Sequence, residues 1–470
     1  MTPLNRRRWL AASLVAAAAS APAMASDTGD VMRVRMEMEV TGNAHLAENP
    51  IASREVDLRL PIESTTVLDY EEASADGRTR RYYHTAGSDT TLNRSRTAIR
   101  LRDDVRRCTV DDDAMPERVS ADEDYLTGDE ADLLVTPLSS VHVDGLLPRR
   151  LFDGGGRPKL RSMSYPTTDA IARAFNLTAV DKSDLSVEVV AVEKDEMKFA
   201  MRGKIDGSVG GVATSLEVVG KLTLDRDRNT CTWAAASIRE RRHVGVARPG
   251  FDVRATVKML RQPMEDSMLG RDDADRPAGS DATVGSSLVH VTSRSLGVTT
   301  LLDRRWHLMS DVAGAAVVRL ADSDRAVAQI DLRRPPALPD GRSWTIGDLE
   351  SDVRNRLDGQ IRDIVARREY RTENGLEVAS VTAAGEVDGV GVRWVVMHLT
   401  DDTGRRAVAT FTMDAASVSD FAGHDEQFAA MFRFLDPADG DGVAAGKSRE
   451  TVRVSGKPAR PQLESASDRR

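Results

Sequence analysis

A cluster of cationic side chains is the part of this sequence best suited to binding chemistry. Arg239, Arg241, Arg242 and His243 stand where a predicted strand ends, shortly before Pro249-Gly250. Guanidinium groups at the rim of a sheet could hold a carboxylate or phosphate through paired hydrogen bonds. The alternative is that these charges lie on the solvent face of the strand and protect its edge. We therefore treat the four residues as a candidate ligand rim.

A second candidate is an apolar stripe near the start of the chain. Met32, Val34, Met36 and Met38 alternate with charged residues, so a strand would place them on one face. Methionine-rich faces adapt to varied ligands, and in a sheet curled into a half-barrel this stripe would line a lipid-sized cavity. The alternative is an ordinary sheet core, because alternating apolar residues normally indicate burial.

Motifs for catalysis are missing from the sequence. It contains no His-Glu-x-x-His, Gly-x-Ser-x-Gly, phosphate-binding glycine loop or Cys-x-x-Cys, and its eight histidines are scattered. We expect no cofactor and no metal site, and we interpret His307, beside Trp306, as structural. Cys108 and Cys231 form an even pair in a chain expected to be exported, which predicts a disulfide.

The first 25 residues have the pattern of an export signal. Arg6-Arg7-Arg8 precede an uncharged stretch rich in alanine, and Ala23-Met24-Ala25 is a small-x-small cleavage site. The arginines and the apolar residues after them fit a twin-arginine signal as well as general secretion. We expect a periplasmic or extracellular protein without a transmembrane anchor. The net charge is −9, which argues against nucleic acid as a partner.

Hydrophobic periodicity divides the rest of the chain. Alternating strands separated by turns predict an antiparallel β-rich domain over residues 31–262, with a short helix over Thr167–Phe175. We interpret residues 263–288 as a linker and 437–470 as a disordered tail. Over 289–436, apolar residues from Ile346 to Ile364 recur at steps of three and four, which predicts a long helix before three strands and a final helix. The fold class expected is therefore α+β.

Two resemblances accompany this division. Asp303-Arg304-Arg305-Trp306, the Ser343-Trp344-Thr345 entry to the long helix and Val392-Arg393-Trp394 make residues 289–436 similar to PsbP-like domains. That resemblance implies an α/β/α sandwich and a non-enzymatic role in binding or stabilising partners outside the cytoplasm.

Residues 31–262 resemble a family of uncharacterised secreted bacterial proteins. The resemblance lies in Arg80-Arg81-Tyr82-Tyr83, Ile99-Arg100-Leu101-Arg102, Gly145-Leu146-Leu147-Pro148 and Glu240–Gly245. It implies no activity. A curved antiparallel sheet with a helix would also be similar to the half-barrels of lipoprotein carriers.

Three functional hypotheses follow. The first is an exported, non-enzymatic envelope protein that binds a ligand or a partner protein. The second is a carrier of lipid or lipoprotein, with a small apolar ligand in a cavity of the N-terminal sheet. The third is a hydrolase with an unrecognised site, whose members need not be close in sequence.

Overall fold

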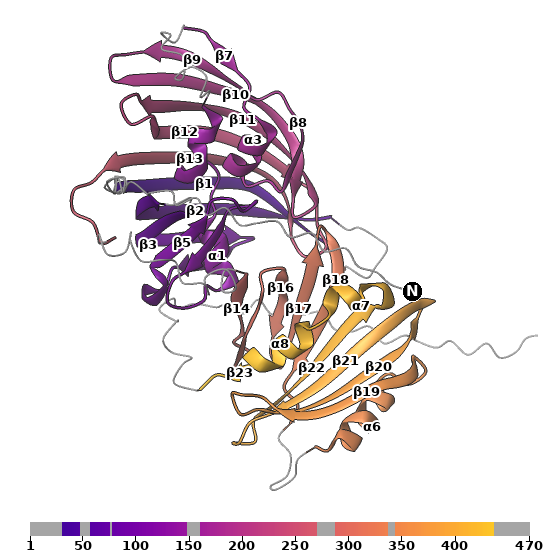
Figure 1. Ribbon diagram of the computed structural model, residues 1–470. Coiled ribbons are helices and arrows are strands. Elements are labelled where there is room, and N and C mark those ends of the chain that lie inside the picture. The colour runs from indigo at the N-terminus through magenta and orange to yellow at the C-terminus, as the bar shows by residue number, and fades with distance from the viewer. Residues whose placement is uncertain are drawn as a thin grey trace, which may run out of the picture.

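The computed structural model describes residues 31–47, 57–75, 78–147, 160–269, 287–336 and 344–436. Figure 1 shows a large curved sheet, drawn from indigo to magenta, above a smaller β-rich part drawn in orange and yellow. We call these the N-terminal and C-terminal parts. The predicted signal segment, most of the predicted linker and the predicted tail lie outside the described residues.

The N-terminal part is built on one antiparallel sheet in the order β6-β5-β3-β2-β1-β13-β12-β11-β10-β9-β7, with β4 paired to β3 and β8 to β10. Its strands are β1 (Met32–Ala47), β2 (Asp57–Ala75), β3 (Arg78–Leu92), β4 (Ser95–Arg100), β5 (Arg107–Asp111), β6 (Arg118–Ala121), β7 (Met163–Ser164), β8 (Ala179–Ser183), β9 (Ser186–Val192), β10 (Glu196–Val209), β11 (Val212–Asp225), β12 (Thr230–Arg242) and β13 (Gly250–Pro263).

Alternation along these strands gives the sheet one apolar face. On β1, Met36 pairs with Leu68 of β2 on one side and with Met259 of β13 on the other, and all three are buried. Side chains directly opposite one another share a face of the sheet, so this register places the apolar residues of successive strands in one continuous surface.

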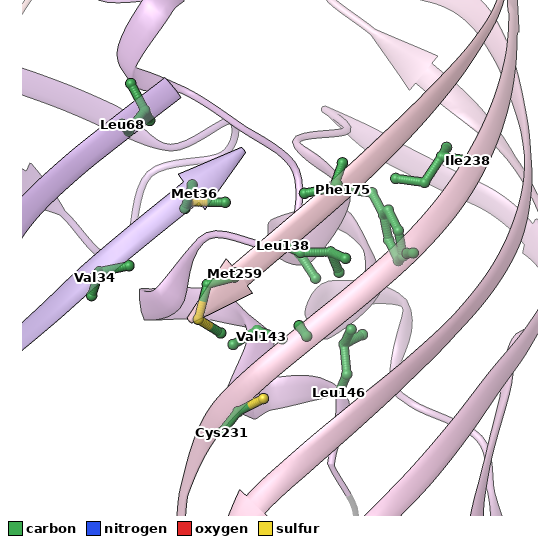
Figure 2. Close-up of a cluster of buried hydrophobic side chains, with 14 of the residues drawn as sticks. Val34, Met36, Leu68, Leu138, Val143, Leu146, Phe175, Cys231, Ile238 and Met259 are labelled. Atoms are coloured by element: carbon green, nitrogen blue, oxygen red, sulfur yellow. The ribbon is translucent and has the colours of Figure 1, made fainter. Parts of the chain in front are cut away.

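A helical segment between β6 and β8 fills the concave side of the sheet. We call it the inner segment, residues 122–147 and 165–177, and its elements are α1 (Gly128–Leu134), α2 (Ser140–Val143), the 3-10 turn η2 (Asp144–Leu146) and α3 (Thr168–Phe175). Figure 2 shows Leu138, Val143 and Leu146 of this segment gathered with strand residues such as Met36 and Met259. The helix predicted over Thr167–Phe175 is confirmed as α3, with the Thr167 hydroxyl as its cap.

The C-terminal part has two antiparallel sheets, in the orders β14-β15-β23 and β16-β17-β18-β22-β21-β20-β19. Its strands are β14 (Leu288–Ser293), β15 (Val298–Asp303), β16 (Trp306–Val312), β17 (Ala315–Asp322), β18 (Arg325–Arg333), β19 (Ile361–Arg371), β20 (Glu377–Val387), β21 (Val390–Thr400), β22 (Arg406–Asp414) and β23 (Arg433–Phe434). Its helices are α6 (Ile346–Arg356), α7 (Val418–Phe421) and α8 (His424–Met431).

The predicted α+β class and its α/β/α sandwich are wrong, because the described chain is mostly antiparallel β. The long helix expected up to Ile364 ends at Arg356, and Ile361 and Ile364 lie on strand β19. Gly359, at φ +75°, turns the chain between the two elements. The final helix is likewise broken into the short α7 and α8.

The two parts contact each other at two separate places. The turn between β17 and β18 meets the loop after β12, where the Val246 amide donates to Asp324 Oδ1 at 2.8 Å and Arg319 donates to the Val246 carbonyl at 2.7 Å. On the other side, the His290 amide of β14 donates to the Leu126 carbonyl. Val289 of β14 belongs to the core of the N-terminal part.

The predicted disulfide between Cys108 and Cys231 is wrong, because both cysteines are buried and unbridged. Cys108 lies on β5 and Cys231 on β12, five strand-to-strand steps apart in the sheet. Steps of about 4.8 Å place them far beyond the Cα separation of roughly 7 Å that a disulfide allows. Each thiol lies near a backbone carbonyl, Val105 and Trp233 respectively. Within the described residues, no helix has the length and apolar character needed to cross a membrane.

Candidate functional site

A cavity of about 230 Å³ opens between the concave face of the N-terminal sheet and α1. One wall is a single row across four neighbouring strands, in which Met38 pairs with Thr66, Thr66 with Ser88, and Ser88 with Ile99. Because paired residues share a face, the antiparallel register alone brings these four side chains together. The row therefore presents two hydroxyl groups between two apolar side chains.

The hydroxyl groups of this wall belong to a hydrogen-bonded cluster. Thr66 Oγ1 lies 3.1 Å from Ser88 Oγ, and Ser64 Oγ lies 3.2 Å from Ser88 and 2.7 Å from Thr90. Thr66 and Ser88 are both buried. A hydroxyl can donate one hydrogen bond and accept others, so this cluster can reorient to suit a donor or an acceptor on a ligand.

The opposite wall comes from α1 and the residues after it. It consists of two carboxylates, one hydroxyl and two apolar side chains: Asp129, Asp132, Leu133, Val135 and Thr136. A capping box begins the helix, in which Thr127 and Glu130 each accept from the other's backbone amide. Glu130 also accepts from Arg102 Nε at 3.0 Å, which fixes the helix against the end of β4.

Asp132 and Asp129 carry the negative charges of the cavity, and both residues are exposed at its mouth. The protein around the Asp132 carboxyl group raises its pKa by desolvating the charged form, and the neighbouring Asp129 adds to this effect. The positive charges of Arg248, Arg304 and Arg242 act in the opposite direction on the same pKa. Arg304 comes from the C-terminal part, so charges from both parts of the protein act on this carboxylate.

The predicted ligand rim is split by the pleat of β12. Arg239 lies 3.4 Å from Asp252 and Arg241 is exposed, and both belong to the outer face of the sheet. Arg242 lies on the inner face, pairs with Glu240 at 2.6 Å and stacks over the Phe251 ring. Burial lowers the pKa of Arg242. Of the four rim residues, Arg242 is the one whose charge acts on Asp132 in the cavity. His243 is exposed.

The predicted cavity stripe is also divided. Met32, Val34 and Met36 are buried, at most 4% exposed, and Val34 and Met36 belong to the core that packs against the inner segment. Met38 lies two residues further along β1 and lines the cavity. The stripe therefore supplies both a core and one cavity residue.

Beside the cavity, a buried charge cluster joins the inner segment to the sheet. Arg81 of β3 lies 2.9 Å from Glu117 and 3.5 Å from Glu72, and Arg261 of β13 lies 3.0 Å from Glu72. Arg81 also donates to Ser139 at 3.0 Å. The sequence signal for this burial is the position of Arg81 two residues from Tyr83, on the same face of the strand.

The buried cluster contains the residue types of a hydrolase triad without its geometry. His142 Nε2 lies 3.5 Å from Glu117, whereas the Ser139 hydroxyl accepts from Arg81. Among the described contacts, no hydrogen bond joins Ser139 to the His142 ring. Burial lowers the pKa of His142. A nucleophile needs a base within hydrogen-bonding reach, so this cluster is suited to holding the fold together rather than to catalysis.

The cavity itself is suited to binding. Among the described residues, its lining includes carboxylates and hydroxyls but no histidine, cysteine or lysine. Within the described residues, no group of three or more His, Cys, Asp or Glu could hold a metal ion. His307 lies on β16, where burial and the nearby Arg248 lower its pKa to about 4, so it is neutral at physiological pH. A hollow with a few convergent polar groups among apolar side chains has the form of a small-molecule site.

Comparisons with known proteins identify no family for this chain. No family model matches it, and no curated protein matches it in sequence, so the resemblance of residues 31–262 to secreted proteins has no support. Part of the chain resembles the solution structure of cyanobacterial PsbP (CyanoP) from Synechocystis sp. PCC 6803. That match has 14% identity and a TM-score of 0.25, and it covers 32% of this chain and 93% of that one.

Two outer-membrane proteins also match in structure. The translocator domain of the autotransporter NalP from Neisseria meningitidis matches with 7% identity and a TM-score of 0.12, covering 83% of this chain and 88% of that one. OccK5 (OpdH) of Pseudomonas aeruginosa matches with 6% identity and a TM-score of 0.12, covering 82% and 98% respectively.

Proposed function

We propose that the protein is a non-enzymatic binding protein of the periplasm or extracellular space, and that the cavity beside α1 holds a small ligand. The observation that carries this proposal is the cavity of about 230 Å³ between a mixed hydroxyl and apolar wall and the carboxylates of α1. It is smaller than the pockets of roughly 300–1,000 Å³ that enclose drug-sized molecules, which favours a compact ligand.

The lining favours a ligand with a positively charged amine and a short apolar body. An ammonium group can donate to Asp132 and Asp129 on α1, and the Thr66 and Ser88 hydroxyls can accept further hydrogen bonds. Met38 and Leu133 can pack against the apolar portion. The described residues give no support to a lipid cargo, because Met32, Val34 and Met36 are buried side chains and do not line an open space.

The test is a calorimetric titration of the purified protein with benzylamine, using benzyl alcohol and benzoate as matched uncharged and negatively charged probes. We expect benzylamine to bind and the other two to bind at least tenfold more weakly, because a charge-assisted hydrogen bond contributes roughly 1.5–3 kcal/mol. Asp132→Asn should lose at least tenfold in affinity for benzylamine. Glu123→Gln, an exposed change on the same segment, should bind like the wild type.

Equal binding of all three probes would contradict a cation site, as would unchanged affinity in Asp132→Asn. Absence of binding by any of them would remove the support for this ligand class. Native mass spectrometry of the protein from its secreting host offers an independent check. An amine released on denaturation would support the proposal and name the ligand.

A further inference from the structure

A second polar site lies in the C-terminal part, on the face of the seven-stranded sheet that α6 covers. Its central residue is Arg406, at the start of β22, whose side chain is 6% exposed. Its Nε and Nη1 atoms are buried and have no hydrogen-bond partner. The guanidinium lies over the ring of Trp344, 4.8 Å from its centre. Buried guanidinium N–H groups without acceptors are costly, so these two nitrogens are prepared for a ligand or a bound water.

His398 supplies a further unpartnered polar atom on the same face. Arg406 pairs with Thr400 across the β21–β22 ladder, and His398 lies two residues before Thr400, so Arg406 and His398 project from the same side. The His398 ring stacks on Trp344, with ring centres 5.0 Å apart. Its Nδ1 lies 3.3 Å from the Thr400 hydroxyl, and its buried Nε2 has no partner.

The protonation of His398 makes this unpartnered atom a hydrogen-bond donor. Burial and the charge of Arg406 lower the pKa of His398 to about 4, so the ring is neutral at physiological pH. If the Thr400 hydroxyl donates to Nδ1, the proton of the neutral ring is on Nε2. Arg406 and His398 then both present N–H groups with no acceptor among the described residues.

We propose that Arg406, His398 and Trp344 form an oxyanion site that binds a carboxylate or phosphate group. The guanidinium provides the charge and the fork geometry that paired oxygens match. The Nε2 proton of His398 adds a third direction of donation, and Trp344 fixes both side chains by stacking. This site lies on a different sheet from the cavity beside α1 and does not depend on the function proposed for that cavity.

Asp352 of α6 is a negatively charged neighbour of the proposed oxyanion site. Its Oδ1 accepts from Arg356 at 2.8 Å, while its buried Oδ2 has no partner. Burial raises the pKa of this carboxyl group, and the positive charges of Arg333 and Arg406 oppose the rise. As a carboxylate it competes with an incoming anion for Arg406. Removal of its charge should therefore strengthen anion binding.

The test is calorimetric titration of the whole protein with inorganic phosphate and, separately, acetate, at constant ionic strength balanced with sodium chloride. We expect one of these anions to bind, and Arg406→Gln to weaken its binding at least tenfold. Arg371→Gln is the matched control, because Arg371 is an exposed arginine of the same sheet, paired with Asp402. It should bind like the wild type. Tighter binding of phosphate or of acetate assigns the ligand class.

Asp352→Asn gives a readout that does not depend on the folding of Arg406→Gln. We expect it to bind the anion several-fold more tightly than the wild type, and Arg406→Lys, which keeps the charge but loses the fork, to bind several-fold more weakly. Failure of the wild type to bind either anion would overturn the proposal and leave a bound water as the partner of Arg406. Equal binding by wild type and Arg406→Gln, or unchanged binding by Asp352→Asn, would also overturn it.

Discussion

At the scale of single residues, Arg81 shows how a charge is tolerated in the core. Its side chain is 1% exposed, lies 4.7 Å from the centre of the Tyr70 ring and pairs with Glu117 and Glu72. Glu72 in turn accepts from the Ser140 hydroxyl at 2.6 Å. Because these partners come from β2, the inner segment and the loop before β6, the cluster holds the inner segment against the sheet.

Breaking this cluster on one side should be strongly destabilising. Glu117→Gln leaves Arg81 without its closest counter-charge, and removal of one partner from a buried pair costs about 3–5 kcal/mol. Chemical denaturation should show this loss in the free energy of unfolding. Arg96→Gln, which breaks an exposed pair with Asp89 at 3.5 Å, should change it by about 0.5 kcal/mol or less. A loss below about 1 kcal/mol in Glu117→Gln would contradict the role given to the cluster.

Asp112 should make stability depend on pH. Burial raises the pKa of its carboxyl group to about 6, whereas the unfolded value is near 3.9. The folded state therefore holds the proton more tightly, so the contribution of Asp112 to stability is full below about pH 4 and is lost as pH rises to about 6. Asp112→Asn should stabilise the protein by about 1–3 kcal/mol at pH 7 and have little effect at pH 4.

Denaturation curves of Asp112→Asn and wild type at the two pH values check this. Asp113→Asn serves as the control, because Asp113 is the exposed neighbour in the same turn. Equal stabilisation by Asp112→Asn at both pH values would show that its effect does not come from the carboxyl proton.

At the scale of elements, α1 depends on its neighbours because it is only seven residues long. A helix of this length does not form alone in water, so its capping box and its contact with Arg102 must hold it. Glu130 takes part in both the capping box and the contact with Arg102, and it is 3% exposed. Glu130→Ala should therefore destabilise the protein by about 2–3 kcal/mol and displace the carboxylates that line the cavity.

Thermal unfolding and benzylamine titration would measure the two effects of Glu130→Ala together. Asp104→Asn is the matched control, since it removes an exposed partner of the same Arg102. If Glu130→Ala bound benzylamine as tightly as the wild type, α1 would not position the cavity.

Strands with one buried face could be predicted from sequence, and β1 and β10 to β13 follow the expected alternation. The failure at β19 has a specific cause. Two irregularities in its pairing with β20, between Ile361 and Asp363 and between Ile364 and Ala366, break the period of two. Apolar residues three positions apart then imitate the spacing of a helix. The short α1 and α2 were missed because they are defined by capping and tertiary contacts, which periodicity does not record.

At the scale of the whole molecule, the cavity could not be predicted because its lining comes from separate segments. The sequence pattern pointed to Met38, but Thr66, Ser88 and Asp132 reach the same space only through strand register and the return of the inner segment. The charges of Arg242, on β12, and of Arg304, in the C-terminal part, both act on Asp132. Long-range pairing of this kind leaves no local pattern in the sequence.

The way the two parts fit together depends on Gly211, in the turn between β10 and β11. Its φ is +84°, and a Cβ atom there would lie 2.4 Å from the backbone carbon of Ser323 in the β17–β18 turn. No real Cβ contact is that short, so Gly211→Ala must push the two turns apart. We expect faster hydrogen exchange in residues 243–249 and 322–325 and a larger radius of gyration by small-angle X-ray scattering.

Gly210 separates this effect from strain within the turn. It also has a positive φ, +57°, so alanine is strained there too, but its Cβ would meet only Arg248 Nε, at 3.9 Å. Gly210→Ala should therefore lower stability by about 1–2 kcal/mol without loosening the contact between the parts. If the two variants changed hydrogen exchange and scattering equally, the close approach of Gly211 to Ser323 would not determine how the two turns fit together. If they differ as expected, the arginine of the C-terminal part that acts on Asp132 should also move, and benzylamine binding should change in Gly211→Ala alone.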